Sequence, residues 1–180
     1  MKPSELPVTI CSVKTPDGFK DYVTLSAVGA AFKNGLAPAE IVGALIQPIK
    51  DGGAVVPANF ARNRVFVELL HRTIAKHGPS VSGLVAAAKQ QREGWVHIID
   101  GRTPTPQGAV PPEDIIGAFQ VRGGQIIPGS YQQNSNHKIL STQGFLCLDP
   151  AMQEFLLSEV SASAQQGAQA DGPAPGGPAA

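Results

Sequence analysis

Two short runs near the N-terminus contain the apolar side chains that are typical of β-strands. Residues 8–14 are rich in β-branched side chains, and residues 19–23 are interpreted as the return strand. Between the runs, Pro16, Asp17 and Gly18 suit a tight turn, because Pro fixes φ, Asp bonds nearby backbone and Gly accepts positive φ. The pattern predicts an N-terminal β-hairpin.

The next seventy or so residues carry apolar positions at the three- and four-residue spacing of amphipathic helices. Asn59 suits a helix N-cap, and Gly78-Pro79 is a strong stop signal. We expect helices over residues 25–34, 38–47, 60–77 and 80–93. The first two resemble a helix-turn-helix in spacing, but the second offers almost no side chain that reads base edges. We therefore interpret them as a buried helical pair.

Strand patterns return between residues 95 and 148. We expect strands over residues 95–100, 115–121, 125–127 and 145–148, with a polar loop over 131–137. Asp149-Pro150 then suits an N-cap followed by a first-turn proline. The apolar stripe of this last helix ends near Val160. We identify no internal repeat in the sequence.

Strands and helices are segregated along the chain, which predicts an α+β fold rather than alternating βαβ units. We expect an antiparallel sheet, formed mainly by residues 95–148 with the N-terminal hairpin, and helices packed on one of its faces. Residues 1–160 are expected to form a single globular domain. Ser, Ala, Gln, Gly and Pro dominate residues 161–180. Such a segment buries too little apolar surface to offset its ordering entropy, so we expect a disordered tail.

Charge narrows the classes of partner. The chain has 14 Lys and Arg against 14 Asp and Glu, without a basic run, so we expect no nucleic-acid partner. Arg62, Arg64 and Arg72 fall on the predicted helix 60–77 with Glu68 among them, as on a solvated helix face. No run approaches 18 apolar residues, so we expect no membrane partner. The N-terminus lacks an apolar signal segment, which favours a cytoplasmic location.

The cysteine and glycine patterns indicate neither a metal site nor a cofactor. Cys11 and Cys147 lie in separate strand-like runs, and no Cys/His cluster has the spacing of a zinc site. No glycine-rich phosphate loop is present. We favour two buried free thiols, because a disulfide between them would need an oxidising compartment.

The richest group of hydrogen-bonding side chains is the run from Ser130 to His137. Loops held on a rigid scaffold often carry binding function, and the end of the strand 95–100 could lie nearby. Our candidate binding residues are therefore Asp100, Arg102, Tyr131, Asn134, Asn136 and His137. The alternative is a polar surface loop that bonds its own backbone. We interpret the other histidines, His71, His77 and a half-buried His97, as structural.

Our leading hypothesis is a non-enzymatic binding or accessory protein, such as an adaptor, regulator or inhibitor. It would contact a protein partner through a face of its sheet and the loop 128–137. The alternative is a small hydrolase or transferase with His137 as base, assisted by Asp100 or Ser130. No GxSxG nucleophile elbow accompanies these residues. Nucleic-acid binding, the third hypothesis, would require the helix arginines to line a groove with exposed aromatic side chains.

Overall fold

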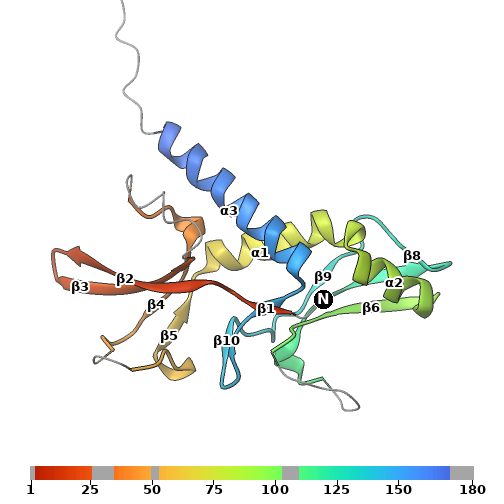
Figure 1. Ribbon diagram of the computed structural model, residues 1–180, viewed down its shortest axis with the longest axis horizontal. Coiled ribbons are helices and arrows are strands. Elements are labelled where there is room, and N and C mark those ends of the chain that lie inside the picture. The colour runs from red at the N-terminus through yellow and green to blue at the C-terminus, as the bar shows by residue number, and fades with distance from the viewer. Residues whose placement is uncertain (1–2, 26–34, 50–52, 103–109, 171–180) are drawn as a thin grey trace, which may run out of the picture.

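The computed structural model describes residues 3–25, 35–49, 53–102 and 110–170, and its mixed architecture confirms the predicted α+β class (Figure 1). Helices α1 (Arg64–His77), α2 (Ser82–Gln91) and α3 (Pro150–Ala170) pack against antiparallel strands. The strands do not join into one sheet, however. Over the described residues they form several small antiparallel sheets.

The first four-stranded sheet contains the N-terminal hairpin that the sequence predicts. Its order is β2 (Val8–Thr15), β3 (Gly18–Leu25), β4 (Ile41–Leu45) and β5 (Phe60–Arg62). Every residue of β2 pairs with one of β3, from Val8 with Leu25 to Thr15 with Gly18. The hairpin is thus the outer half of a sheet, and β2 is its edge strand.

The second sheet contains the strands predicted at 95–100, 115–121 and 125–127. Its order is β6 (Gly94–Ile99), β7 (Ile115–Arg122) and β8 (Gln125–Ile126), and β9 (Gln132–Gln133) also pairs with β7. Two short ladders complete the described strands: β1 (Ser4–Glu5) with β12 (Cys147–Leu148), and β10 (Leu140–Ser141) with β11 (Gly144–Phe145).

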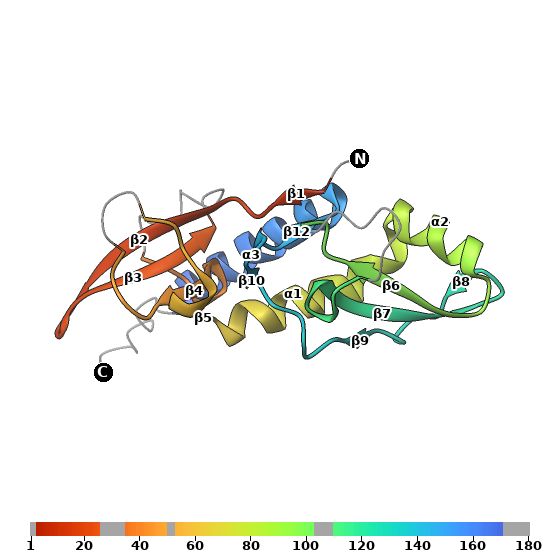
Figure 2. The ribbon, with the colours of Figure 1, turned by 90° about the horizontal axis from the view of Figure 1, so that it is seen from below.

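The two larger sheets lie at opposite ends of an elongated molecule, with α1 between them and α3 packed on α1 (Figures 1 and 2). Apolar side chains from both sheets and all three helices form one buried cluster. A single core therefore connects the two ends. Its largest fully buried side chains include Phe66, Leu70, Ile74, Phe119, Ile116, Leu25, Met152 and Leu156.

The helix predicted over residues 38–47 is wrong. Pro38–Glu40 form one 3-10 turn, and the chain then enters strand β4. Gly43 explains the preference for a strand, because a Cβ there would lie 2.4 Å from the Phe60 ring and 2.6 Å from the Ala61 carbonyl oxygen. That close strand pairing overrides a helix-like apolar spacing. The helix predicted over 25–34 lies, apart from Leu25, outside the described residues.

The bounds of three helices also differ from prediction, and α2 is two residues shorter at each end than the predicted helix 80–93. Helix α1 begins at Arg64, and its N-cap is Asn63 rather than Asn59, because residues 60–62 belong to β5. Helix α3 continues to Ala170, past the end predicted near Val160. Alanine is the best helix former and recurs in this stretch, so the helix continues on local propensity after its buried face ends. Residues 171–180 lie outside the described part.

The structure reveals an internal repeat that we did not identify in the sequence. Strands β3, β4 and β5 form the first repeat unit, and β6, β7 and β9 form the second. In the first unit Tyr22, Val23 and Thr24 pair with Ala44, Gly43 and Ile41. In the second, His97, Ile98 and Ile99 pair with Ala118, Gly117 and Ile115. The register shifts at the same place in both, between Val23 and Thr24 and between Ile98 and Ile99.

The third strands of the two units match as well. Gly43 pairs with Arg62, and Gly117 pairs with Gln133, so these residues are equivalent. Each glycine leaves room for an aromatic ring at the third strand of its unit. A Cβ on Gly117 would lie 2.7 Å from the Tyr131 ring, and a Cβ on Gly43 would lie 2.4 Å from the Phe60 ring. The glycines therefore mark a close approach that both units require.

An asparagine closes each unit in the same way. Asn63 donates from Nδ2 to the carbonyl oxygens of Pro38 and Ile41, both at 2.7 Å. Asn134 donates to those of Pro112 and Ile115, also at 2.7 Å. A 3-10 turn precedes the middle strand in both cases, Pro38–Glu40 and Pro112–Asp114. The repeat thus extends from strand pairing to individual side-chain bonds.

Candidate functional site

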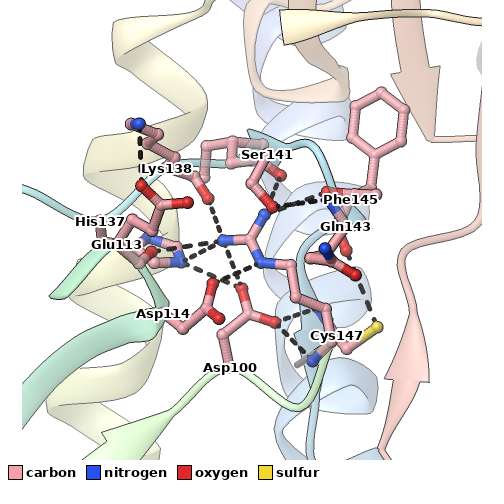
Figure 3. Close-up of polar contacts among 12 residues, drawn as sticks. Asp100, Glu113, Asp114, His137, Lys138, Ser141, Gln143, Phe145 and Cys147 are labelled. Carbon is pink, nitrogen blue, oxygen red and sulfur yellow. Dashed lines mark hydrogen bonds and ion pairs between the residues drawn. The ribbon is translucent and has the colours of Figure 1, made fainter. Parts of the chain in front are cut away.

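Four charged or titratable side chains meet in one cluster: Asp100, Arg102, Asp114 and His137. Figure 3 shows how Asp100, Asp114 and His137 point toward one another. Asp100 follows β6, Asp114 ends the 3-10 turn before β7, and His137 follows β9. Their side chains are at most 2% exposed. The structure therefore brings together three of the residues selected from the sequence and adds Asp114, which was not among them.

Arg102 connects the members of this cluster. Its Nη2 lies 2.8 Å from Asp100 Oδ2, and its Nε donates to Asp114 Oδ1 at 2.9 Å. His137 Nε2 lies 3.2 Å from the same Asp100 oxygen. A planar guanidinium presents five N–H donors in fixed directions, so it serves two carboxylates and two backbone carbonyl oxygens at once, whereas a lysine has only three donors.

The remaining donors of Arg102 bind backbone carbonyl oxygens. Nη1 donates to Gly144 at 3.0 Å, and Nη2 donates to Lys138. Asp100 Oδ1 meanwhile accepts a bond from the Cys147 backbone at 2.9 Å. Because these bonds join β6 and β7 to the segment 138–147, the cluster fixes the C-terminal strands against the second sheet.

The polar loop satisfies much of its own hydrogen bonding. The Asn134 side chain bonds backbone groups at both ends: Nδ2 donates to the Pro112 and Ile115 carbonyl oxygens, and Oδ1 accepts from the Asn136 backbone N–H at 3.0 Å. Tyr131 lies half-buried, with its hydroxyl 2.7 Å from His71 Nδ1. The side chain of Asn136 is exposed. Of the six candidate binding residues, Asp100, Arg102 and His137 thus form one buried cluster, whereas Tyr131, Asn134 and Asn136 lie around it.

His71 is buried in helix α1 and held neutral. Burial, with smaller contributions from the nearby His137 and Arg62, lowers the pKa of His71 to about 4. A neutral imidazole can accept the hydrogen bond of the Tyr131 hydroxyl, and burial raises the pKa of that phenol. The pair therefore connects helix α1 to the second repeat unit through a bond between two uncharged groups.

The geometry around His137 meets one requirement of the hydrolase alternative and not the other. The ring pairs with Asp100 as the hydrolase alternative requires, but the side chain is only 2% exposed. Ser130 donates its hydroxyl to Ile127 O at 2.7 Å and accepts from the Gln120 backbone at 3.0 Å. It makes no hydrogen bond to His137, and both residues belong to the described chain. A nucleophile and its base must lie within hydrogen-bond reach.

One surface feature was missed because its central residue was interpreted as half-buried. His97 is exposed, and so are its neighbours on the same face of β6, Trp95 at 38% and Ile99 at 47%. Val96 and Ile98 point into the core instead. The strict alternation of this strand could have revealed an outward row of Trp, His and Ile, since side chains at every second position share a face. We call Trp95, His97 and Ile99 the β6 row.

The other sequence expectations concern single residues. Cys11 and Cys147 are free and half-buried rather than fully buried, and burial together with Asp100 raises the pKa of the Cys147 thiol. Over the described ranges, no group of His, Cys, Asp or Glu side chains is arranged to hold a metal ion. Among the helices of the same ranges, none is long and apolar enough to cross a membrane.

Comparison of the chain with protein-family models, curated proteins and solved structures gives no significant match.

Proposed function

We propose that this protein is a non-enzymatic binding module that takes up an extended segment of a partner protein along strand β6. The observation that carries the proposal is the β6 row on an edge strand. Within the described ranges, β6 pairs with β7 on one side only. An edge strand offers unpaired backbone groups to a further strand, and alternate side chains then give specificity.

The internal repeat indicates what belongs at this edge. Strand β3 is the counterpart of β6 in the first repeat unit, and its outer edge is occupied by β2 along its whole length. Thr24, the counterpart of Ile99, is fully buried, and its hydroxyl donates to the Thr9 backbone of β2. Ile99 is 47% exposed at the equivalent position. Over the part of the chain that is described, the second unit thus leaves the outer edge of β6 exposed, whereas β2 covers the equivalent edge of β3 in the first unit.

The residues of the β6 row suit a protein ligand. Tryptophan is enriched at interface hot spots, and large aromatic side chains bury much area on binding. The row faces outward, and strand β7 separates β6 from β9 and the polar loop, so a strand added to β6 would contact the row. The opposite face of β6 packs against α2 and is unavailable.

The alternative of a small hydrolase or transferase receives less support from the geometry. A substrate would have to reach a histidine that is 2% exposed and already paired with Asp100. Removing Arg102 or Asp100 would then act first on folding, so loss of activity in such variants would not identify a catalytic role.

Selection of extended peptides from a random library displayed on phage tests the proposal without knowledge of the partner. Enriched peptides are expected to bind the wild-type chain and to lose at least about tenfold in affinity with Trp95→Ser, because a buried Trp anchor contributes 2 kcal/mol or more. Phe19→Ser is the matched control, since Phe19 is 72% exposed on the β2–β3 hairpin, away from β6. Peptides that respond equally to both substitutions, or no enrichment at all, would contradict the proposal.

A further inference from the structure

A second surface feature lies where the two repeat units meet. The third strand of the first unit, β5, faces the segment 135–140, which follows the third strand of the second unit. Arg62 at the end of β5 donates to the His137 carbonyl oxygen across this junction, at 3.4 Å. Between the two segments is a hollow of about 540 Å³, within the size range of small-ligand sites.

The hollow is lined by both apolar and basic side chains. Its apolar lining consists of the buried Ile139 and Leu140 and of Pro57 and Phe60. The other lining residues are Arg62, Ser135, Asn136, His137 and Lys138, and the lining includes no carboxylate. Lys138 and His137 pair with Glu113 and Asp100, which lie outside the lining, so Arg62 is the lining cation without a carboxylate partner among the described residues.

Arg62 is the cation best placed to act on a ligand. Over the described residues it forms no ion pair, and its bond to His137 is long. Lys138, by contrast, is already paired with Glu113 at 2.9 Å.

We infer that this hollow binds a small organic carboxylate with an apolar body, its carboxylate on Arg62 and its hydrocarbon part over Ile139, Leu140 and Phe60. A guanidinium bonds a carboxylate through two parallel N–H donors, which the long single bond of Arg62 leaves available. The inference does not depend on the β6 row, because the two features lie on different elements.

Titration of the full ¹⁵N-labelled chain with phenylacetate, followed by amide chemical shifts, tests the inference. Saturable shifts are expected in residues 60–62 and 135–140. Phenylacetamide, which has the same body without the charge, is expected to bind at least about fivefold more weakly, and Arg62→Gln is expected to weaken phenylacetate by a similar factor. Arg64→Gln is the matched control, because Arg64 is exposed and pairs with Glu68. Trp95→Ser is expected to leave binding unchanged.

Three outcomes would overturn the inference: equal binding of the acid and the amide, no saturable shifts, or shifts centred elsewhere on the chain. The comparison of acid with amide uses only the wild-type protein, so it remains decisive if a variant fails to fold. Failure of this titration would leave the proposed peptide site untouched, and failure of peptide selection would leave the hollow untouched.

Discussion

Replacing Arg102 by methionine should destabilise the protein more than any other substitution of a basic residue. The change removes the partner of Asp100 and Asp114, which are 0% and 2% exposed, and it also removes bonds to the carbonyl oxygens of Gly144 and Lys138. Breaking a buried ion pair by deleting one partner costs about 3–5 kcal/mol, since an unpaired charge remains buried. The whole unfolding free energy of a domain is only about 5–15 kcal/mol.

Urea unfolding followed by far-ultraviolet circular dichroism measures this loss, with Arg122→Met as the control. Arg122 lies exposed at the end of β7, where substitution should change the unfolding free energy by less than about 0.5 kcal/mol. Asp114→Asn should cost less in the Arg102→Met background than in the wild-type chain, because the two side chains interact directly. A loss below about 1 kcal/mol for Arg102→Met, or strict additivity with Asp114→Asn, would refute the assignment of a stabilising role to the cluster.

Three further predictions concern stability. Because the pKa of His71 is lowered from 6.5 to about 4 on folding, the unfolded chain binds more protons than the folded chain between these pH values. The unfolding free energy should therefore fall as the pH decreases through this window, by up to roughly 3 kcal/mol. His71→Gln should remove that part of the pH dependence in urea titrations. Gly117→Ala should lower the unfolding free energy by about 1–3 kcal/mol, because its Cβ would lie 2.6 Å from the Gln132 carbonyl oxygen and from the Tyr131 hydroxyl. Gly83→Ala is the control: its Cβ would have nothing nearer than 3.9 Å, so thermal melts should show a neutral or stabilising effect. Asn63→Ala and Asn134→Ala should each cost about 1–2 kcal/mol, and a large difference between them would argue against equivalent roles in the two repeat units.

Local signals predicted the elements whose structure depends on local chemistry. The Pro-Asp-Gly turn of the hairpin, the Gly-Pro stop after α1 and the Asp149-Pro150 start of α3 all lie where the sequence places them. Strand β4 could not be found in this way. A short run such as Ile41–Leu45 fits a helix and a strand equally well, and only the Phe60 ring against Gly43 decides between them.

The repeat left a trace in the sequence that is visible once the structure is known. Residues 38–45 (PAEIVGAL) and 112–119 (PEDIIGAF) share the first proline, an acidic residue at the third position and the Gly-Ala pair. Residues 57–63 (PANFARN) and 128–134 (PGSYQQN) share the first proline, the aromatic residue at the fourth position and the last asparagine. The connection between these segments is shorter in the second unit, which hides the period. Only part of the candidate site could be predicted, because its residues are distant in sequence. Asp100 and His137 come together through the pairing of β6, β7 and β9, which the sequence does not show.

The central claim is that the free edge of β6 accepts a strand, and amide hydrogen exchange tests it most directly. Exchange is measured on the full chain, alone and with a peptide selected on it. The account predicts that binding slows exchange in Gly94–Ile99 while the amides of β2 and β3 stay unchanged. Protection confined to other elements, with β6 exchanging as fast as in the free protein, would contradict it.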